Sequence, residues 1–409
     1  MAEPLVVLVA ARDEEARIGR SVEALRAAFP AARVVVADDG SRDATAGEAG
    51  RAGATVVRLP RLGKGQALTL AEREAPAGRL LLCDADLDGD LAPLLENDAD
   101  LVIAAFARRE GGGLGIAKRT ARALVSTLGG LDTREPLSGQ RALSPAARAA
   151  CFPLAPGFGC EVRMTIDAAR AGLRVEEREL DLRHRATGRD ARGFLHRGRQ
   201  LLDALLACGP TAVNHRGLRL PLVGAVVALV PGRVRPAVAV TAALGLADDL
   251  WSGPERGFRA HLGKGSTTGV AKAVGIPLVA LAATRSLRKA AVVALAANAL
   301  NQLDTRPGRA LKAFAIGAAL VRGDAARYLP IAVLLAPYDL REMTMLGDAG
   351  ANALGAVLGF GSVGRLTARG QILCIAGLAG LTAVGEIRSL GALIERTPGL
   401  RELDALGRA

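Results

Sequence analysis

Acidic and basic side chains recur in the N-terminal part of the chain where short apolar runs end. The motifs are RDEE with Asp13 and Glu14, ADDGSRD with Asp39 and Gly40, LGKGQ with Lys64, and CDADLDGD with Asp84 and Asp86. Strand residues i and i+2 point to the same side, so Asp84 and Asp86 would present two carboxylates together. Carboxylate oxygens are ligands that Mg²⁺ and Mn²⁺ prefer. Asp39 suits ribose hydroxyls, and Lys64 between glycines can approach a phosphate or a base closely. The motifs therefore predict a site for a nucleoside diphosphate and a divalent cation.

The elements around these motifs alternate between apolar strands and amphipathic helices as far as about residue 210. The expected strands are 5–10, 32–39, 55–59, 79–86 and 100–106, and the expected helices are 16–29, 45–53 and 65–75. Such alternation predicts a mostly parallel sheet between helices. Ligands of such sheets bind at the carboxyl ends of the strands, where the motifs fall.

In this order the motifs resemble those of GT-A-fold glycosyltransferases of the inverting type, which include polyprenyl-phosphate sugar transferases. The resemblance covers about residues 5–207. It implies an α/β, Rossmann-like nucleotide-sugar domain over residues 1–210, with a UDP-sugar as the favoured donor and Mg²⁺ or Mn²⁺ as the cofactor. It assigns the metal to Asp84 and Asp86, and the donor to Ala11, Asp13, Glu14, Asp39, Gly40, Lys64 and Asp84.

The resemblance also extends to later stretches and implies roles for residues in two of them. SGQRAL (138–143) precedes GFGCEVRMT, where Glu161 would begin an acceptor-side helix as the general base. The alternative is that Glu161 is only a carboxylate favoured by the helix dipole. His184 would complete the metal shell or would be a surface histidine. Three arginines would hold an acceptor or leaving phosphate: Arg183, Arg185 and Arg189. No QxxRW motif follows, which disfavours processive synthases of the cellulose type.

After His215 the chain becomes a series of apolar segments. They are 219–231, 236–247, 267–284, 288–303, 309–322, 328–339, 349–361 and 370–386. Most are shorter than the roughly 20 residues that cross a bilayer comfortably. One interpretation is a soluble all-helical domain, and the other is a bundle of short transmembrane and re-entrant helices. Because each segment is apolar nearly all round, we expect an all-α, multi-pass membrane domain over residues 211–409, with the N-terminal domain in the cytoplasm.

Three acidic islands interrupt these segments. They contain Asp248 and Asp249 in LGLADDLWSG, then Asn298, Asn301 and Asp304 in NALNQLD, then Asp348 in LGDAGAN. Two apolar segments separate each island from the next, so single crossings would bring all three islands to one face. Arginines and lysines in the opposite loops do not support this orientation by the positive-inside rule.

The order of the islands resembles the polyprenyl-phosphate N-acetylhexosamine-1-phosphate transferases over about residues 245–361. The resemblance implies catalytic roles around Mg²⁺ for Asp248, Asp249, Asp304 and Asp348, and phosphate contacts for Asn298 and Asn301. Three features depart from that family: its N-terminal helices have no counterpart, its second aspartate falls on Pro307, and its histidine-rich loop is absent. The segment is therefore either an active short variant or a bundle that only docks the N-terminal domain on a membrane.

The bulk composition limits the partners. The 409 residues suggest two domains, and the net charge is +12. Aromatic residues make up only 3% and the arginines are scattered, which disfavours nucleic acid and leaves anionic membranes or phosphorylated substrates. The five cysteines form no CxxC, so we expect no disulfide framework or zinc site, and the start shows no signal peptide.

The stretch HLGKGSTTG resembles a phosphate-binding loop but lacks the Ser or Thr that a Walker motif needs directly after Lys264. Lys264 and Lys272 are therefore better candidates for contacts with lipid phosphates.

Together these features predict a metal-dependent glycosyltransferase that moves a sugar to a lipid-linked or phosphorylated acceptor in cell-envelope glycan synthesis. Two alternatives concern the C-terminal half. It either transfers sugar-1-phosphate to polyprenyl phosphate itself or serves as a non-catalytic membrane anchor or scaffold.

Overall fold

The computed structural model describes residues 4–86, 89–96, 98–106, 115–182, 191–251, 267–387 and 390–408. The chain divides into two units. The N-terminal unit consists of Met1–Gly209 with Arg216–Arg219, and the helical unit consists of Pro210–His215 with Leu220–Ala409.

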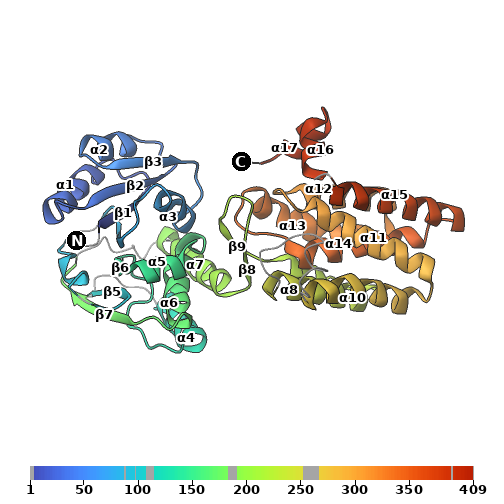
Figure 1. The fold of residues 1–409 in the computed structure, drawn as a ribbon, viewed down its shortest axis with the longest axis horizontal. Coiled ribbons are helices and arrows are strands. Elements are labelled where there is room, and N and C mark those ends of the chain that lie inside the picture. The colour runs from blue at the N-terminus through green and yellow to red at the C-terminus, as the bar shows by residue number, and fades with distance from the viewer. Residues whose placement is uncertain are drawn as a thin grey trace. The chain divides into compact units, whose positions relative to one another are not determined.

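The N-terminal unit is built on one seven-stranded sheet (Figure 1). Its strands are β1 (Leu5–Ala11), β2 (Arg33–Asp39), β3 (Thr55–Leu59), β4 (Arg79–Asp84), β5 (Leu101–Phe106), β6 (Arg141–Leu143) and β7 (Val175–Leu180). Their order is β3-β2-β1-β4-β6-β5-β7, and only β6 runs antiparallel to its neighbours. The central strands are runs of buried Val, Leu and Ala, as expected for a sheet covered on both faces. The predicted mostly parallel sheet is confirmed.

Helices cover both faces of this sheet. The set is α1 (Ile18–Ala28), α2 (Thr45–Arg51), α3 (Lys64–Glu72), α4 (Ile116–Gly129), α5 (Pro145–Cys151), α6 (Cys160–Arg170) and α7 (Ala191–Cys208), with 3-10 helices η1 (Ala92–Leu94) and η2 (Gly157–Gly159). Alternate residues of β1 face opposite layers: Val7 and Val9 pack with α1 and α2, whereas Val6 and Leu8 pack with α3, α5 and α6. Helix α4 forms an outer layer on α6 and α7.

The register of the sheet places the acidic motifs at one edge. Ala11 of β1 lies opposite Asp38 of β2, and Ala10 lies opposite Asp84 of β4. The carboxyl ends of β1, β2 and β4 therefore meet side by side. The residues that follow these strands are brought within reach of one another.

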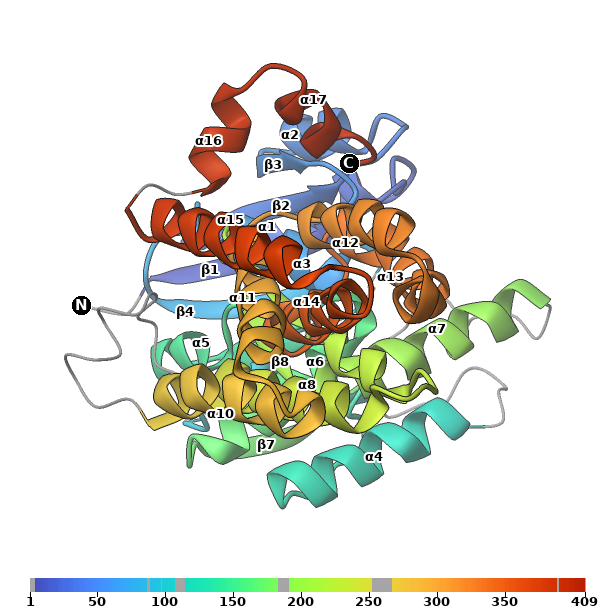
Figure 2. The same ribbon diagram turned by 90° about the vertical axis from the view of Figure 1, so that its right-hand side faces the viewer.

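The helical unit begins with a short hairpin and continues almost entirely as helices. Its elements are β8 (Thr211–Val213), β9 (Arg219–Pro221), η3 (Gly224–Leu229), α8 (Arg235–Trp251), α10 (Thr267–Thr284), α11 (Leu287–Leu303), α12 (Arg309–Val321), η4 (Gly323–Tyr328), α13 (Leu329–Leu340), α14 (Gly347–Val363), α15 (Ala368–Ile387), α16 (Leu390–Arg396) and α17 (Leu400–Ala405). Helix α14 lies among α8, α11 and α12 (Figure 2). Small residues permit this packing, because a Cβ on Gly355 of α14 would lie 2.5 Å from the carbonyl oxygen of Ala296 on α11.

One apolar segment differs from its prediction. Residues 219–231 were expected to form a membrane or core segment like the others, but they form β9 and the 3-10 helix η3. Met345 donates its N–H to the carbonyl of Pro221 at 2.8 Å and accepts the N–H of Val223 at 3.0 Å, which keeps this backbone extended. A Cβ on Gly224 would lie 1.9 Å from the carbonyl oxygen of Leu346, so this turn sits directly on the start of α14. Residues 219–231 therefore do not form a helix that crosses a membrane.

The close packing of α3 predicts a stability difference between two Gly→Ala variants in the N-terminal unit. A Cβ on Gly65 would lie 1.8 Å from the carbonyl oxygen of Ala155, whereas a Cβ on Gly198 of α7 would meet nothing within 4 Å. Gly65→Ala should destabilise the unit by about 1–3 kcal/mol through overpacking. Gly198→Ala should stabilise α7 by up to about 1 kcal/mol. Hydrogen exchange of the β1 and β4 amides measures both effects, and equal protection in the two variants would contradict the packing described.

Candidate functional site

The loops that follow β1 and β2 are joined to each other by hydrogen bonds. Asp13, with a φ of 54°, accepts the N–H of Arg42 through Oδ1 at 2.9 Å and donates its own N–H to Ser41 Oγ at 3.0 Å. Glu14 donates its N–H to Thr45 Oγ1 at 2.7 Å. These bonds fix the backbone after Ala11 at the carboxyl edge of the sheet. The predicted donor-binding residues of the first two motifs are thus brought together.

Asp39 organises the approach to Lys64. Its Oδ1 accepts the N–H groups of Leu62 at 2.6 Å and Gly63 at 2.9 Å, and its side chain is buried. The adjacent Gly40 has a φ of 69°, and a Cβ there would lie 2.8 Å from the backbone nitrogen of Arg61. The role expected for Asp39 was a ribose contact. The structure adds a second one, because this carboxylate holds the loop that leads into α3.

Lys64 lies between two carboxylates from distant parts of the chain. Its Nζ is 2.6 Å from Asp84 Oδ1 at the end of β4 and 2.7 Å from Glu161 Oε1 in the first turn of α6. The side chains of Lys64 and Glu161 are 17% and 5% exposed. The thiol of Cys160 donates to Glu161 Oε2 at 3.0 Å. The sequence motifs around Lys64, Asp84 and Glu161 therefore form one cluster.

The charges in this cluster determine its protonation. Burial by itself would lower the pKa of Lys64, but the carboxylates of Asp84 and Glu161 outweigh burial and hold the pKa well above its usual range. Lys64 therefore remains an ammonium.

Gln140 and Gly139 contact the cluster but had no role in the sequence-based prediction. Gln140 Nε2 donates to Asp84 Oδ2 at 3.0 Å. A Cβ on Gly139 would lie 2.4 Å from Asp84 Oδ2 and 2.7 Å from Lys64 Nζ. The SGQRAL stretch runs into β6, the antiparallel strand beside β4, and this places it on the site. The sequence marked this stretch as part of the resemblance, but the contacts of these two residues depend on the pairing of β6 with β4, which local sequence does not reveal.

The carboxylates after β4 are suited to a divalent cation. Asp86 follows Asp84 by two residues, in the turn after the strand. The Lys64 ammonium on Asp84 shows that a cation is accommodated at this oxygen. Among the described ranges no group of three or more His, Cys, Asp or Glu side chains could hold a metal by itself. A metal ion at Asp84 and Asp86 would thus need further ligands from the donor phosphates, from water or from outside those ranges.

Four predicted residues lie outside the described residues: Arg183, His184, Arg185 and Arg189.

A second cluster lies in the helical unit, at the N-terminus of α14. Three N–H groups there are accepted by aspartates from two other helix ends. Leu346 donates to Asp339 Oδ1 at 3.2 Å, and Asp348 and Ala349 donate to the two oxygens of Asp249 at 3.1 Å. Asp304, at the end of α11, lies close to the same aspartates. The first N–H groups of a helix have no partners within the helix and carry the positive end of its dipole. The acidic islands predicted to share one face are gathered by this helix end.

The other residues of the islands have different partners. Lys272 of α10 forms ion pairs with both Asp248 and Asp348. Asn298 Nδ2 donates to Thr382 Oγ1 of α15 at 3.1 Å, so its amide bridges α11 and α15. The carbonyl oxygen of Asn301 accepts the N–H of Asp304 at 3.0 Å. Of the two lysines proposed for lipid phosphates, Lys272 joins the cluster and Lys264 lies outside the described residues.

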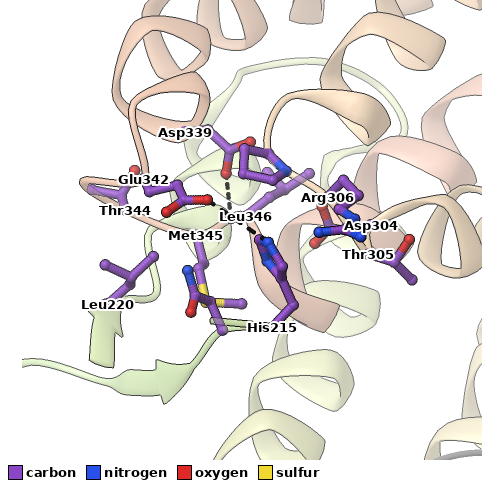
Figure 3. A pocket seen from close by; sticks show the side chains of 12 residues that line it. His215, Leu220, Asp304, Thr305, Arg306, Asp339, Glu342, Thr344, Met345 and Leu346 are labelled. Atoms are coloured by element: carbon purple, nitrogen blue, oxygen red, sulfur yellow. Dashed lines mark hydrogen bonds and ion pairs between the residues drawn. The ribbon is translucent and has the colours of Figure 1, made fainter. Parts of the chain in front are cut away.

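A cavity of about 50 Å³ opens beside this second cluster (Figure 3). Asp304, Asp339, Glu342 and His215 line it, and His215 Nε2 lies 3.9 Å from Glu342 Oε1. Burial, followed by the charges of Asp339, Asp348 and Asp249, raises the pKa of Asp304 well above its usual range. The cavity is large enough for ordered water. Asp339 is a residue that sequence reasoning missed, since no motif marks it.

The contacts of Asp249 predict its contribution to stability. Asp249→Ala removes the acceptors of two N–H groups in the first turn of α14, and should destabilise the helical unit by about 1–3 kcal/mol. Asp324→Ala is the matched control, because Asp324 forms only a partly exposed pair with Arg327 and should change stability by less than about 0.5 kcal/mol. Hydrogen exchange of α14 amides measures the difference. Equal exchange in the two variants would show that Asp249 does not hold this helix end.

Comparisons with known proteins concern the N-terminal unit. Residues 6–140 match the family model described as glycosyl transferase family 2. Glycosyltransferase AglJ of Haloferax volcanii is 31% identical over 156 residues, which are 35% of this chain and 52% of that protein. Protein RfbJ of Shigella flexneri is 30% identical over 115 residues, which are 26% of this chain and 88% of that protein. The chain thus spans about half the length of AglJ and most of RfbJ.

Two solved structures of the glucosyl-3-phosphoglycerate synthase of Mycobacterium tuberculosis are also similar. The complex with phosphoglyceric acid is 26% identical with a TM-score of 0.43, over 54% of this chain and 86% of that chain. The complex with Mn²⁺, UDP and glucosyl-3-phosphoglycerate is 25% identical with a TM-score of 0.42, over 54% of this chain and 87% of that chain. From the family model and the similarity to RfbJ, the chain belongs to glycosyl transferase family 2, and its N-terminal unit contains the glycosyltransferase domain.

Proposed function

We propose that the N-terminal unit transfers a sugar from a UDP-sugar to a lipid-linked or phosphorylated acceptor, with Mg²⁺ or Mn²⁺ as cofactor. The observation that carries this proposal is the cluster of Lys64, Asp84 and Glu161 at the carboxyl edge of the sheet. A nucleoside diphosphate carries phosphate charges that need both a metal ligand set and a cationic side chain. Asp84 with Asp86 supplies the first, and Lys64 supplies the second.

The loops beside the cluster fit the rest of the donor. The backbone after Ala11 and the Asp39 loop border the same edge and are held by the bonds of Asp13 and Asp39. Pre-formed loops of this kind lower the entropy lost when a ligand binds. We assign the nucleoside to this side and the diphosphate to the side of Lys64 and Asp84.

The transfer reaction assigns a task to each group. An acceptor oxygen attacks the anomeric carbon, the bond from that carbon to the diphosphate oxygen breaks, and UDP leaves with both electrons of that bond. A divalent cation bound at Asp84 and Asp86 would offset the charge that develops on the leaving diphosphate. Lys64 adds a hydrogen-bond donor beside that charge. Glu161 is the candidate base for a hydroxyl acceptor, whereas a phosphate acceptor needs no strong base.

Exposed apolar side chains on the helical unit support a membrane location. Large apolar residues are more than 70% exposed on four different helices: Trp251, Leu287, Leu320, Leu373 and Ile387. Large exposed apolar surface on a protein marks contact with lipid or with another protein. In the described part of the chain one stretch, Ala368–Gly385 of α15, is long and apolar enough to cross a membrane, and only 6% of it is buried. We therefore propose a lipid-linked acceptor at the cell membrane, with the N-terminal unit in the cytoplasm. We also propose that the helical unit crosses the membrane several times rather than once.

Loss of Asp84 tests the donor site. Asp84→Asn removes the charge that would hold the cation, so release of UDP from UDP-sugar and polyprenyl phosphate should fall by about 10² or more. Glu23→Gln, which removes one exposed charge from α1, is the matched control and should leave the rate unchanged. Turnover of Asp84→Asn within a few-fold of the unaltered protein would refute the assignment of this carboxylate.

A second activity is proposed for the helical unit on a separate observation. Asp248, Asp348 and Lys272 lie in direct contact, and α14 brings Asp249 and Asp304 beside them. This arrangement supports transfer of sugar-1-phosphate from a UDP-sugar to polyprenyl phosphate, in which the phosphate oxygen of the lipid attacks the β-phosphorus and UMP leaves. The competing proposal is that the same charges only stabilise a membrane scaffold.

The nucleotide product separates these two proposals. If the helical unit is an enzyme, UMP should form with UDP-sugar, Mg²⁺ and polyprenyl phosphate, and Asp248→Asn or Asp304→Asn should reduce UMP formation by about 10². Asp324→Asn is the control at a partly exposed aspartate of the same unit. Absence of UMP with the unaltered protein, together with unchanged UDP release in the Asp248 variant, would exclude the second activity and favour the scaffold.

A further inference from the structure

The Lys64 ammonium occupies the oxygen of Asp84 that a divalent cation would need. Lys64 Nζ lies 2.6 Å from Asp84 Oδ1, and the other oxygen, Oδ2, accepts Gln140 Nε2 at 3.0 Å. Both oxygens of this carboxylate are thus engaged. The ammonium repels a metal ion that would bind Oδ1 at an ordinary distance of about 2.1 Å, so the two cations compete for this oxygen.

Two features fix the position of Lys64: the hydrogen-bonded backbone that leads into α3, and the contact of its ammonium with Glu161. Its backbone begins α3, directly after the two N–H groups that Asp39 accepts, and Gly63 enters the helix with a φ of 102°. Its ammonium is held by the second carboxylate, Glu161, which is more buried than Asp84, with side chains 5% and 33% exposed. If Asp84 were taken by a metal, Lys64 would still retain Glu161. The ammonium then needs only a short displacement to face the departing phosphates.

We propose that the Lys64 ammonium is an internal counter-ion of Asp84 until the donor and the metal bind. We further propose that Glu161 is a positioning residue, which keeps the ammonium in the site when the metal displaces it from Asp84. This inference rests on the proposed UDP-sugar and metal function of the same site. It gives Glu161 a role through Lys64 in addition to the proposed role as a base for a hydroxyl acceptor. Without nucleotide, the ammonium competes with the metal for Asp84. With nucleotide, the diphosphate provides the negative charge that both cations require, so metal and donor bind together.

The inference predicts opposite shifts in metal affinity for two variants. Lys64→Met frees Asp84, so nucleotide-free protein should bind Mn²⁺ at least about tenfold more tightly than the unaltered chain. Glu161→Gln leaves Lys64 with Asp84 as its only carboxylate partner in the cluster, so Mn²⁺ binding should weaken several-fold. Arg51→Met is the control, because Arg51 pairs with Glu48 on α2, its side chain is 69% exposed, and its loss should leave Mn²⁺ affinity unchanged.

The experiment is a Mn²⁺ titration of the full chain, followed by the electron paramagnetic resonance signal of free Mn²⁺, with and without UDP. Folding of each variant is checked by hydrogen exchange of the β4 amides. Tighter binding in Lys64→Met without UDP, and loss of that advantage with UDP, is the expected result. Unchanged or weaker Mn²⁺ binding in Lys64→Met, or tighter binding in Glu161→Gln, would overturn the inference. If Lys64→Met does not fold, the direction of the Glu161→Gln shift decides alone.

A further variant separates failure of this inference from failure of the proposed function. Asp84→Asn should lose Mn²⁺ binding with and without UDP. If it binds Mn²⁺ with UDP as tightly as the unaltered protein, the metal site itself is wrong. If Asp84→Asn loses Mn²⁺ binding but Lys64→Met binds Mn²⁺ no more tightly than the unaltered protein, the assignment of the metal to Asp84 stands. The proposed competition between Lys64 and the metal is then wrong.

Discussion

A carboxylate removed from water is stable only where hydrogen-bond donors or positive charges meet it, and both units are arranged around this constraint. In the N-terminal unit the Lys64 ammonium lies between Asp84 and Glu161 and draws the end of β4 and the start of α6 together. In the helical unit the N–H groups at the start of α14 receive Asp249 and Asp339 from two helix ends. Without these positive partners, neither group of carboxylates could be assembled from such distant parts of the chain.

The two aspartates at the end of α8, Asp248 and Asp249, have different partners that stabilise their charge. Asp249 accepts backbone N–H groups and so serves the fold, whereas Asp248 contacts Lys272 together with Asp348. One member of the pair therefore holds a helix end, and the other forms an ion pair with a lysine. In the N-terminal unit Asp39 and Asp84 divide in the same way: Asp39 holds a loop, and Asp84 holds an ammonium. In each unit, the carboxylate that faces a lysine is the better candidate for chemistry.

Sequence alone predicted the elements whose hydrophobic period is regular and whose partners are near in the chain. The strands at the centre of the sheet and helices α10, α11 and α14 are present close to their predicted bounds. Strand β6 was not predicted, because three residues cannot show a period and its pairing with β4 and β5 is not local. Residues 219–231 read as a helical segment because they are apolar, but their backbone pairs with Met345 far along the chain. Tertiary hydrogen bonds outweighed local preference there.

The candidate sites also combine residues that local sequence identifies with contacts that only the fold creates. Asp84, Lys64 and Glu161 were identified from motifs, yet their direct contact depends on packing between α3, β4 and α6 that no motif records. Gln140 and Asp339 lie in no motif with an assigned role, and only the fold brings them to the carboxylates.

The most direct measurement is a structure of the protein with Mn²⁺ and UDP in which the metal is located by its anomalous scattering. The account predicts a manganese peak bonded to Asp84 and to the diphosphate, with Lys64 Nζ moved from Asp84 toward Glu161 and the phosphates. A manganese peak away from Asp84, or a diphosphate bound while Lys64 keeps its contact with Asp84 Oδ1, would contradict it.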